Sequence, residues 1–116
     1  GEAVGLFPDH APGMGVGVWA NFFGTPAFTM TLPRKLQRVS GAAFMITFAE
    51  RLPCGKGFRL HFEPLSAHEF DEEKLNQAVE ALVRRYPEQY YWNYNRYKNI
   101  FLRRQRRGQQ SRRPRR

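Results

Sequence analysis

The stretch AAFMITFAERLPCGKGFRLHFE, which runs from residue 42 to residue 63, contains the strongest strand signals in this chain. Residues 42–49 form a continuous apolar run, which is typical of a strand covered on both of its faces. A glycine-rich turn follows, and residues 58–63 then alternate between an apolar and a polar side. The pattern predicts an antiparallel hairpin whose second strand buries one side, formed by Phe58, Leu60 and Phe62.

Helical signals occur on both sides of this hairpin. Before it, residues 29–40 place apolar side chains at helical spacing, and Gly41 suits the C-terminal cap of a helix. The members of this apolar face are Leu32, Leu36 and Val39. After the hairpin, residues 71–86 open with acidic residues, repeat apolar residues at helical spacing and end before Pro87.

The first thirty residues contain weaker strand signals. Residues 3–8 (AVGLFP) predict a short apolar strand, and the glycine-rich residues 9–17 predict a loop. Residues 18–28 are apolar but interrupted by a glycine and a proline, which indicates a short extended piece and a turn. The order of elements predicts an α/β fold with a mixed sheet of about three or four strands and two main helices. Because one strand is expected to be central, we expect a further sheet partner.

Basic charge is concentrated at the C-terminal end of the chain. The 116 residues carry a formal net charge of +9, but residues 103–116 contain eight arginines and no acidic residue, so residues 1–102 are nearly neutral. We expect residues 1–102 to form one domain and residues 103–116 to form a disordered basic tail.

The single cysteine, Cys54, excludes an internal disulfide, and no apolar run is long enough to span a bilayer.

Three blocks of sequence carry a resemblance to a known family, and the last of them is the most specific. The blocks are FPDH at 7–10 with GVW at 17–19 and FFGTPA at 22–27; GA at 41–42 with ERLP at 50–53 and GKGF at 55–58; and PEQYYWNYNRYK at 87–98. Over residues 3–98 the chain resembles the lipid A biosynthesis acyltransferases, the lauroyl and myristoyl transferases of Gram-negative bacteria within the lysophospholipid acyltransferase superfamily. The α/β fold is then expected to be part of an acyltransferase-type layer.

The resemblance implies a reaction, its partners and a location. Members of this family move a fatty acyl chain from an acyl-carrier-protein thioester to a hydroxyl of a Kdo-bearing lipid A precursor. They act at the cytoplasmic face of the inner membrane, so an anionic membrane surface is a further expected partner. The resemblance implies neither a cofactor nor a metal, and no specific nucleic acid is expected.

The family's catalytic residues are not expected within this chain. The family's base is a histidine in a His-(four residues)-Asp/Glu motif, where the acid orients the imidazole that deprotonates the attacking hydroxyl. In the family this motif precedes the first block, after an N-terminal membrane helix. His68 and Glu73 have the right interval, but they lie on the wrong side of that block, and an acidic helix start explains them. We therefore expect the C-terminal part of such an enzyme, inactive by itself.

Polar candidates for holding the acceptor occur in the first two blocks. Asp9 and His10 follow a predicted strand and lead into a glycine-rich loop, where α/β enzymes place polar site residues; the alternative is a solvated turn capped by Asp9. Arg51 follows a predicted strand and is expected near the site. The alternative for Arg51 is a salt bridge with Glu50 or Glu63.

The third block supplies two cations, Arg96 and Lys98, beside many aromatic residues. By the resemblance, these cations would meet lipid A phosphates and Kdo carboxylates. The alternative is that the aromatic residues of 90–98 anchor this segment on the sheet while Arg96 pairs with an acid.

Apolar candidates for an acyl groove or a membrane interface are Trp19, Phe22 and Phe23. The alternative for Phe22, and for Phe28 close to it, is ordinary core packing.

The helix predicted over residues 29–40 has a basic face, whose members are Arg34, Lys35 and Arg38. This face is either solvated or in contact with anionic lipid.

Two other functions are open. The arginine-rich tail would suit a nucleic-acid-binding protein, because clustered cations contact phosphates, although residues 1–102 lack a recognisable nucleic-acid motif. A non-catalytic interaction domain that docks through an open sheet edge is the second alternative. Deleting residues 103–116 separates the first from an acyltransferase, since a nucleic-acid binder would lose its activity while a fragment of a lipid enzyme would keep its fold.

Overall fold

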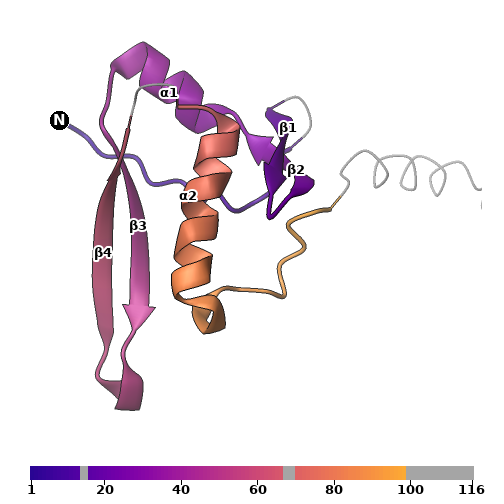
Figure 1. The fold of residues 1–116 in the computed structure, drawn as a ribbon. Helices are drawn as coiled ribbons and strands as arrows, with labels where there is room; N and C mark the ends of the chain where they lie inside the picture. The colour runs from indigo at the N-terminus through magenta and orange to yellow at the C-terminus, as the bar shows by residue number, and fades with distance from the viewer. Residues whose placement is uncertain (14–15, 67–69, 99–116) are drawn as a thin grey trace, which may run out of the picture.

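The computed structural model describes residues 1–13, 16–66 and 70–98 of the chain. Within them, two β-hairpins lie on either side of a long helix (Figure 1). The elements in chain order are β1 (Gly17–Phe22), β2 (Thr25–Met30), α1 (Leu32–Ser40), β3 (Phe44–Arg51), the short 3-10 helix η1 (Pro53–Gly55), β4 (Phe58–Leu65), α2 (Glu72–Arg85) and the 3-10 helix η2 (Pro87–Gln89). The predicted α/β class with two main helices is confirmed, while the strands are divided between two antiparallel sheets.

The first hairpin turns tightly between β1 and β2. Phe23 and Gly24 have φ values of 49° and 74°, and two adjacent positive φ values are typical of a two-residue hairpin turn. The sequence predicted one short extended piece here, but the structure has a complete second strand, in which Pro26 lies opposite Asn21. The proline is tolerated because both members of a two-stranded sheet are edge strands.

The second hairpin confirms the predicted pairing of β3 with β4. The strands are antiparallel, with Phe44 opposite Leu65 and Arg51 opposite Phe58. The prediction that the first of these strands is covered on both faces is wrong, since burial alternates along β3 and Met45 is 54% exposed. The described residues cover only the face of this sheet that lies toward α2.

The second strand of this hairpin buries the opposite side from the one predicted. The apolar side of β4 is exposed, and its members are Phe58, Leu60 and Phe62. His61 and Glu63 point instead toward α2 and its C-terminal end, where their contacts are made. The reason is the register, because residues opposite each other share a face: His61 lies opposite Phe48, which packs on the ring of Tyr86.

Local signals place the two helices correctly. The first begins at Leu32, slightly later than predicted because the preceding residues belong to β2, and it ends at Gly41, whose φ is 63°. The second begins after Asp71, whose side chain accepts a hydrogen bond from the Lys74 backbone N–H at 2.8 Å. It ends before Pro87, as predicted.

The apolar face predicted for α1 does not reach the core. Val39 is 89% exposed and Leu32 is nearly half exposed, whereas Pro33 is the buried residue of this helix. Arg34 forms an ion pair of 2.8 Å with Glu72 in the first turn of α2. A polar contact therefore fastens α1 to α2, and part of its apolar stripe faces solvent.

Residues 3–8 form no strand, so the strand predicted there is wrong. The segment runs past β3 toward α2 (Figure 1), and Leu6 and Pro8 line the space between these two elements. Val4 and Phe7 are largely exposed. An apolar run becomes a strand only where a neighbouring strand takes up its backbone hydrogen bonds, and the described residues supply no such neighbour here.

The core lies between the first hairpin and α2. It consists of Phe22, Ala27, Val79 and Val83, with Phe23, Ile46 and Tyr90 packed against it. Among the described residues, neither α1 nor α2 has the length and apolar character needed to cross a membrane. The predicted basic tail and His68 lie outside the described residues.

Candidate functional site

An aromatic stack joins the beginning of the described chain to its end. The His10 ring stacks on Phe7, at 5.4 Å between ring centroids, and on Tyr94, at 4.7 Å. The Lys98 Nζ lies 4.9 Å from the centroid of the Tyr94 ring and adds a cation to the stack. We call these four residues, Phe7, His10, Tyr94 and Lys98, the His10 stack.

A hydrogen bond fixes the turn at His10 to the C-terminal segment. The backbone N–H of Ala11 donates to the Tyr94 hydroxyl at 2.8 Å, across 83 positions of sequence. The turn itself is closed by a hydrogen bond of 3.3 Å from the His10 N–H to the Phe7 carbonyl. The structure thus brings together the predicted site residues Asp9, His10 and Lys98, whose role in binding stays a prediction.

Arg96 lies inside the protein, behind this stack. It is only 3% exposed, and burial lowers the pKa of its guanidinium, although the neighbouring phenols and Asp9 oppose the shift. One terminal nitrogen donates to the Phe28 carbonyl at 2.7 Å; the other donates to Thr29 Oγ1 at 2.9 Å and Asn76 Oδ1 at 3.2 Å. These acceptors are neutral, and Arg96 pairs with no acid in the part of the chain that the structure describes, which contradicts the predicted alternative. Substrate contact by Arg96 stays a prediction, and its observed contacts are internal.

Asn76 of α2 connects Arg96 to the first hairpin, and it is not among the site residues predicted from the sequence. The side chain is 1% exposed, and its Nδ2 donates to the Asn21 carbonyl at 3.1 Å and to Thr29 Oγ1 at 3.0 Å. With Oδ1 accepting from Arg96, the amide makes three of the four hydrogen bonds open to it. A signal for it exists in the sequence, since position 76 falls on the helix face of Val79 and Val83.

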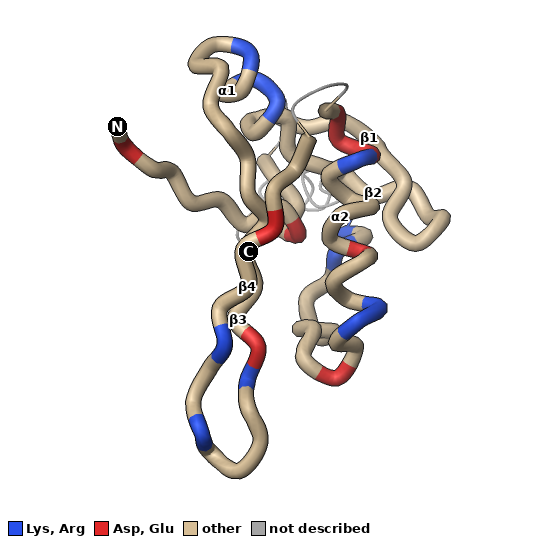
Figure 2. Tube along the Cα trace, turned by 60° about the vertical axis from the view of Figure 1, so that its left-hand side comes forward, with Lys and Arg blue, Asp and Glu red and all other residues tan. Residues whose placement is uncertain are grey.

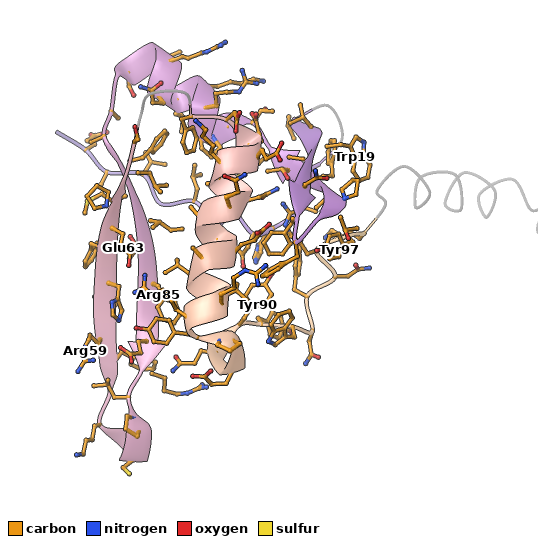
Figure 3. All side chains as sticks on the ribbon, in the orientation of Figure 1. Trp19, Arg59, Glu63, Arg85, Tyr90 and Tyr97 are labelled. Carbon is orange, nitrogen blue, oxygen red and sulfur yellow. The ribbon has the colours of Figure 1, made fainter. Side chains whose placement is uncertain are left out.

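Other side chains of residues 90–98 anchor this segment, as the alternative interpretation expected. The Tyr97 hydroxyl donates to the Phe22 carbonyl at 2.6 Å, and Trp92 Nε1 donates to the Pro87 carbonyl at 2.7 Å. Tyr90 and Tyr97 both lie on the side of α2 that faces the first hairpin (Figure 3). Burial, with the charge of Asp9, raises the pKa of Tyr90, whose hydroxyl has no hydrogen-bond partner within the described residues.

An apolar groove of about 600 Å³ lies between β3 and α2. Its walls include Ile46, Phe48, Val79, Leu82, Val83 and Tyr86. Residues 5–9 line it as well, so Asp9 belongs both to the groove and to the turn that carries His10. No local sequence pattern indicates this groove, because its walls come from four separate segments, which are residues 5–9, residues 46–49, Leu60 and residues 79–91.

The three aromatic residues predicted for an acyl groove lie elsewhere. Phe22 belongs to the core, as the alternative interpretation expected, and Phe23 packs edge-on against it at 4.8 Å between ring centroids. Trp19 is about half exposed and packs against Phe28. Phe22 and Phe23 line a second hollow of about 450 Å³ beside residues 90–97, and none of the three lines the groove between β3 and α2.

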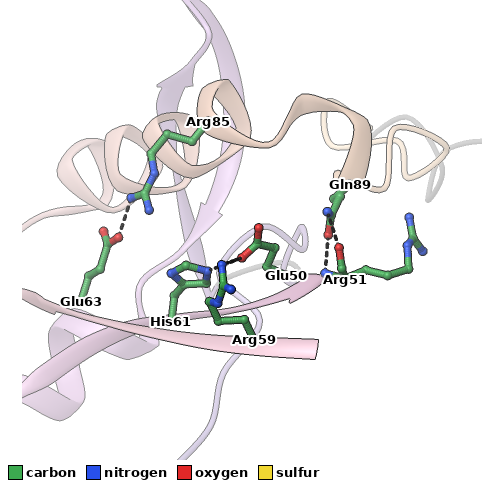
Figure 4. A network of polar contacts seen from close by, with 7 residues as sticks. All are labelled: Glu50, Arg51, Arg59, His61, Glu63, Arg85 and Gln89. Atoms are coloured by element: carbon green, nitrogen blue, oxygen red, sulfur yellow. Dashed lines mark hydrogen bonds and ion pairs between the residues drawn. The ribbon is translucent and has the colours of Figure 1, made fainter. Parts of the chain in front are cut away.

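Arg51 lies at the end of β3, where Gln89 holds its backbone (Figure 4). The Arg51 N–H donates to Gln89 Oε1 at 2.7 Å, and Gln89 Nε2 donates to the Arg51 carbonyl at 3.1 Å. The predicted alternative of a salt bridge from Arg51 is not found, because Glu50 contacts His61 and Arg59. Glu63, its other predicted partner, pairs with Arg85.

The pair of His61 and Glu50 shows a histidine beside a carboxylate, with 2.9 Å between Nε2 and Oε2. Arg59 contacts the same oxygen at 3.4 Å, and the rings of Phe48 and Tyr86 pack on His61. Neither His61 nor Glu50 lines the groove, so this pair ties β3 to β4. Across residues 1–13, 16–66 and 70–98, no cluster of His, Cys, Asp and Glu suited to a metal ion is found.

Comparison with known proteins gives consistent matches. A family model described as bacterial lipid A biosynthesis acyltransferase matches residues 1–99, which include the His10 stack. The chain is similar to the lipid A biosynthesis lauroyltransferase of Escherichia coli (strain K12), with 34% identity over 105 residues, and to the palmitoleoyltransferase of the same organism, with 33% over 104 residues. A lipid A biosynthesis acyltransferase of Shigella flexneri is also 33% identical over 104 residues.

The matched region covers most of this chain and a smaller part of each relative. It includes 84% of this chain and 34% of each of these three proteins. The chain therefore spans about a third of the length of these relatives. The family model matches all of the residues that the structure describes. The chain belongs to the bacterial lipid A biosynthesis acyltransferase family.

Proposed function

We propose that this chain is part of an enzyme that transfers a fatty acyl chain from acyl-carrier-protein to a hydroxyl of a Kdo-bearing lipid A precursor. The observation that carries the proposal is the family match over residues 1–99, which includes the Asp9–His10 turn and the aromatic segment 90–98. Relatives named for lauroyl and palmitoleoyl transfer support a long acyl chain as the transferred group. The enzyme would act at the cytoplasmic face of the inner membrane.

The surfaces beside Asp9 suit an amphiphilic substrate. The groove between β3 and α2 is apolar, and its volume of about 600 Å³ lies within the usual range of small-molecule sites. The neighbouring His10 stack carries the ammonium of Lys98, which can meet a phosphate or a carboxylate. We assign the groove to an acyl chain. We assign Asp9, His10 and Lys98, together with Arg51 at the end of β3, to the polar part of the acceptor.

The first helix supports contact with an anionic membrane surface. It carries basic residues and no acidic ones (Figure 2), and Arg34 is engaged with Glu72 while Lys35 and Arg38 are exposed. The exposed Val39 lies beside these cations. An apolar side chain flanked by cations is the combination by which a helix adsorbs to an anionic bilayer.

The reaction is tested by a chimera. The matching 105 residues of the E. coli lauroyltransferase are replaced by the corresponding residues of this chain. The chimera is assayed with acyl-carrier-protein thioester and a Kdo-bearing lipid A precursor. We expect transfer by the chimera and none by the 116-residue chain alone, because the family's base is expected outside it. A chimera that folds like its parent and transfers nothing would contradict the proposal.

The role of Lys98 is tested within that chimera. Lys98→Met is expected to raise the KM for the phosphorylated acceptor about tenfold, which corresponds to about 1.4 kcal/mol, because one charge-assisted contact is lost. Lys56→Met removes the same charge from the turn between β3 and β4, which has no assigned role in binding, and serves as the matched control. Equal KM values for the two variants would remove Lys98 from the acceptor site.

A further inference from the structure

We propose that Arg96 is a positioning residue, which holds the His10 stack in place from inside the core without touching a ligand. This inference deepens the proposed function, and it rests on that function only for the use of the stack as an acceptor site. The contacts run from the guanidinium of Arg96, through Tyr94, to His10.

The first step is the anchoring of the guanidinium. Its hydrogen bonds reach two elements, the Phe28 carbonyl and Thr29 Oγ1 on β2 and Asn76 Oδ1 on α2, at 2.7, 2.9 and 3.2 Å. A buried charge is costly unless hydrogen bonds compensate it; Nε has no partner among the described residues, so the bonds of the two terminal nitrogens supply this compensation and hold Arg96 to one geometry. The ring of Phe22 lies 5.5 Å from the guanidinium carbon and closes the site from the core side.

The second step is the transmission to Tyr94. The Arg96 backbone N–H donates to the Tyr94 carbonyl at 3.0 Å, so the two residues form one tight turn. A displacement of the guanidinium therefore displaces the Tyr94 backbone. On the other side of Arg96, the hydroxyl of Tyr97 holds the Phe22 carbonyl at 2.6 Å, which keeps this turn against β1.

The third step is the transmission to His10. Tyr94 contacts the turn in two ways, through its hydroxyl, which accepts from the Ala11 N–H, and through its ring, which stacks on the imidazole. Both contacts depend on the position of the Tyr94 side chain. The orientation of the His10 ring is thus set by a residue that makes no contact with it.

The chemistry of this anchor requires arginine. A guanidinium is a planar fork whose nitrogens reach acceptors on two elements at once, whereas a lysine ammonium is a single point of charge on a flexible stem. Arg96→Lys keeps the charge and removes the fork. A residue that bound an anionic ligand by charge would tolerate this substitution far better than a residue that sets geometry.

The experiment reads the His10 ring and the Ala11 amide by NMR in the full 116-residue chain, without any assay of transfer. We expect Arg96→Lys and Tyr94→Phe each to shift both signals and to raise amide exchange at Ala11 at least tenfold. In the double variant the two effects should be strongly non-additive, because both act through one contact. Lys35→Met, which removes a charge from α1 outside the His10 stack, is the matched control, and we expect it to shift neither signal.

A second variant guards against a failure of Arg96→Lys to fold. Thr29→Val removes the Oγ1 that Arg96 and Asn76 share and keeps the shape of the side chain. It should move the same two signals in the same direction by a smaller amount. The inference is overturned if Arg96→Lys or Thr29→Val folds and shifts both signals no more than the control variant Lys35→Met does. It is also overturned if the effects of Arg96→Lys and Tyr94→Phe simply add up in the double variant. Inactivity of the chimera would bear on the proposed function alone.

Discussion

Three tyrosines of the C-terminal segment use their hydroxyl groups in different ways. Tyr94 accepts a hydrogen bond from Ala11, and Tyr97 donates one to the Phe22 carbonyl. The hydroxyl of Tyr90 is buried without a partner in the described chain. A buried hydroxyl that makes no hydrogen bond reduces stability. The hydroxyl of Tyr90 therefore lowers the free energy of unfolding, whereas the hydroxyls of Tyr94 and Tyr97 raise it.

Replacing single hydroxyls tests this difference. Tyr90→Phe is expected to leave the free energy of unfolding at pH 7 unchanged or to raise it, by up to about 1 kcal/mol, because it removes an unpaired polar atom. Tyr97→Phe is the matched control and should lower it by about 1 kcal/mol, since a hydrogen bond is lost. Urea unfolding curves of both variants measure these changes, and a larger loss for Tyr90→Phe would refute the assignment.

The same residues predict a loss of stability at alkaline pH. Burial raises the pKa of Tyr90 and of Tyr97 above the ordinary value of 10.0. The unfolded chain therefore ionises first, and the stability present below pH 10 is lost as the pH rises through the folded-state values. Tyr90→Phe should make the decline between pH 9 and 11 shallower, and an unchanged slope would contradict this part of the prediction.

At the scale of elements, the two helices differ in what holds them. α2 has a side-chain cap at Asp71 and buries Leu75, Val79 and Val83. α1 buries Pro33 and is fastened by the ion pair of Arg34 with Glu72. Most helical stability in proteins comes from the packing of an apolar face, so α1 is the less firmly held element. Its exposed apolar and basic residues remain available to a partner.

Vesicle binding tests the use that we assign to α1. The variant with Lys35→Glu and Arg38→Glu should bind vesicles containing phosphatidylglycerol at least tenfold more weakly, because each basic residue near such a surface contributes about 1 kcal/mol. Lys56→Glu changes one charge in the turn between β3 and β4 and should bind like the unmodified chain. Flotation assays with phosphatidylcholine vesicles control for charge, and equal binding by all three proteins would exclude α1 from the membrane contact.

At the scale of the whole molecule, the second hairpin meets the core through Ile46 of β3. Side-chain contacts connect it to α2 and its C-terminal end: Glu63 with Arg85, Phe48 with Tyr86 and the Arg51 backbone with Gln89. Its outer face carries exposed apolar residues, which are Met45, Phe58, Leu60 and Phe62. Contiguous apolar surface of this kind promotes association.

This surface predicts how the isolated chain behaves at high concentration. We expect the chain to self-associate, and we expect the double variant Phe58→Lys and Phe62→Lys to reduce its light scattering several-fold with little change in Tm. Phe48→Lys places the same charge on the inner face and should unfold the hairpin, because its ring packs on Tyr86. Unchanged scattering in the double variant would place the association elsewhere.

The sequence by itself determined those features whose causes lie within a few residues. Gly41, Asp71 and Pro87 bound the helices through caps and backbone restrictions that act locally. The hairpin of β3 and β4 followed from its turn, and the motif blocks indicated the family that the comparisons confirmed.

Only the tertiary structure decided which surfaces face inward. Phe62 alternates like a buried residue but is 56% exposed, because the register with β3 turns its side of the strand away from α2. Arg96 has the type of a ligand-binding residue, yet acceptors on β2 and α2 draw it into the core. The stack of His10 on Tyr94 likewise joins segments that are far apart in the sequence. Such contacts depend on how elements pack, and local patterns of residues do not encode that arrangement.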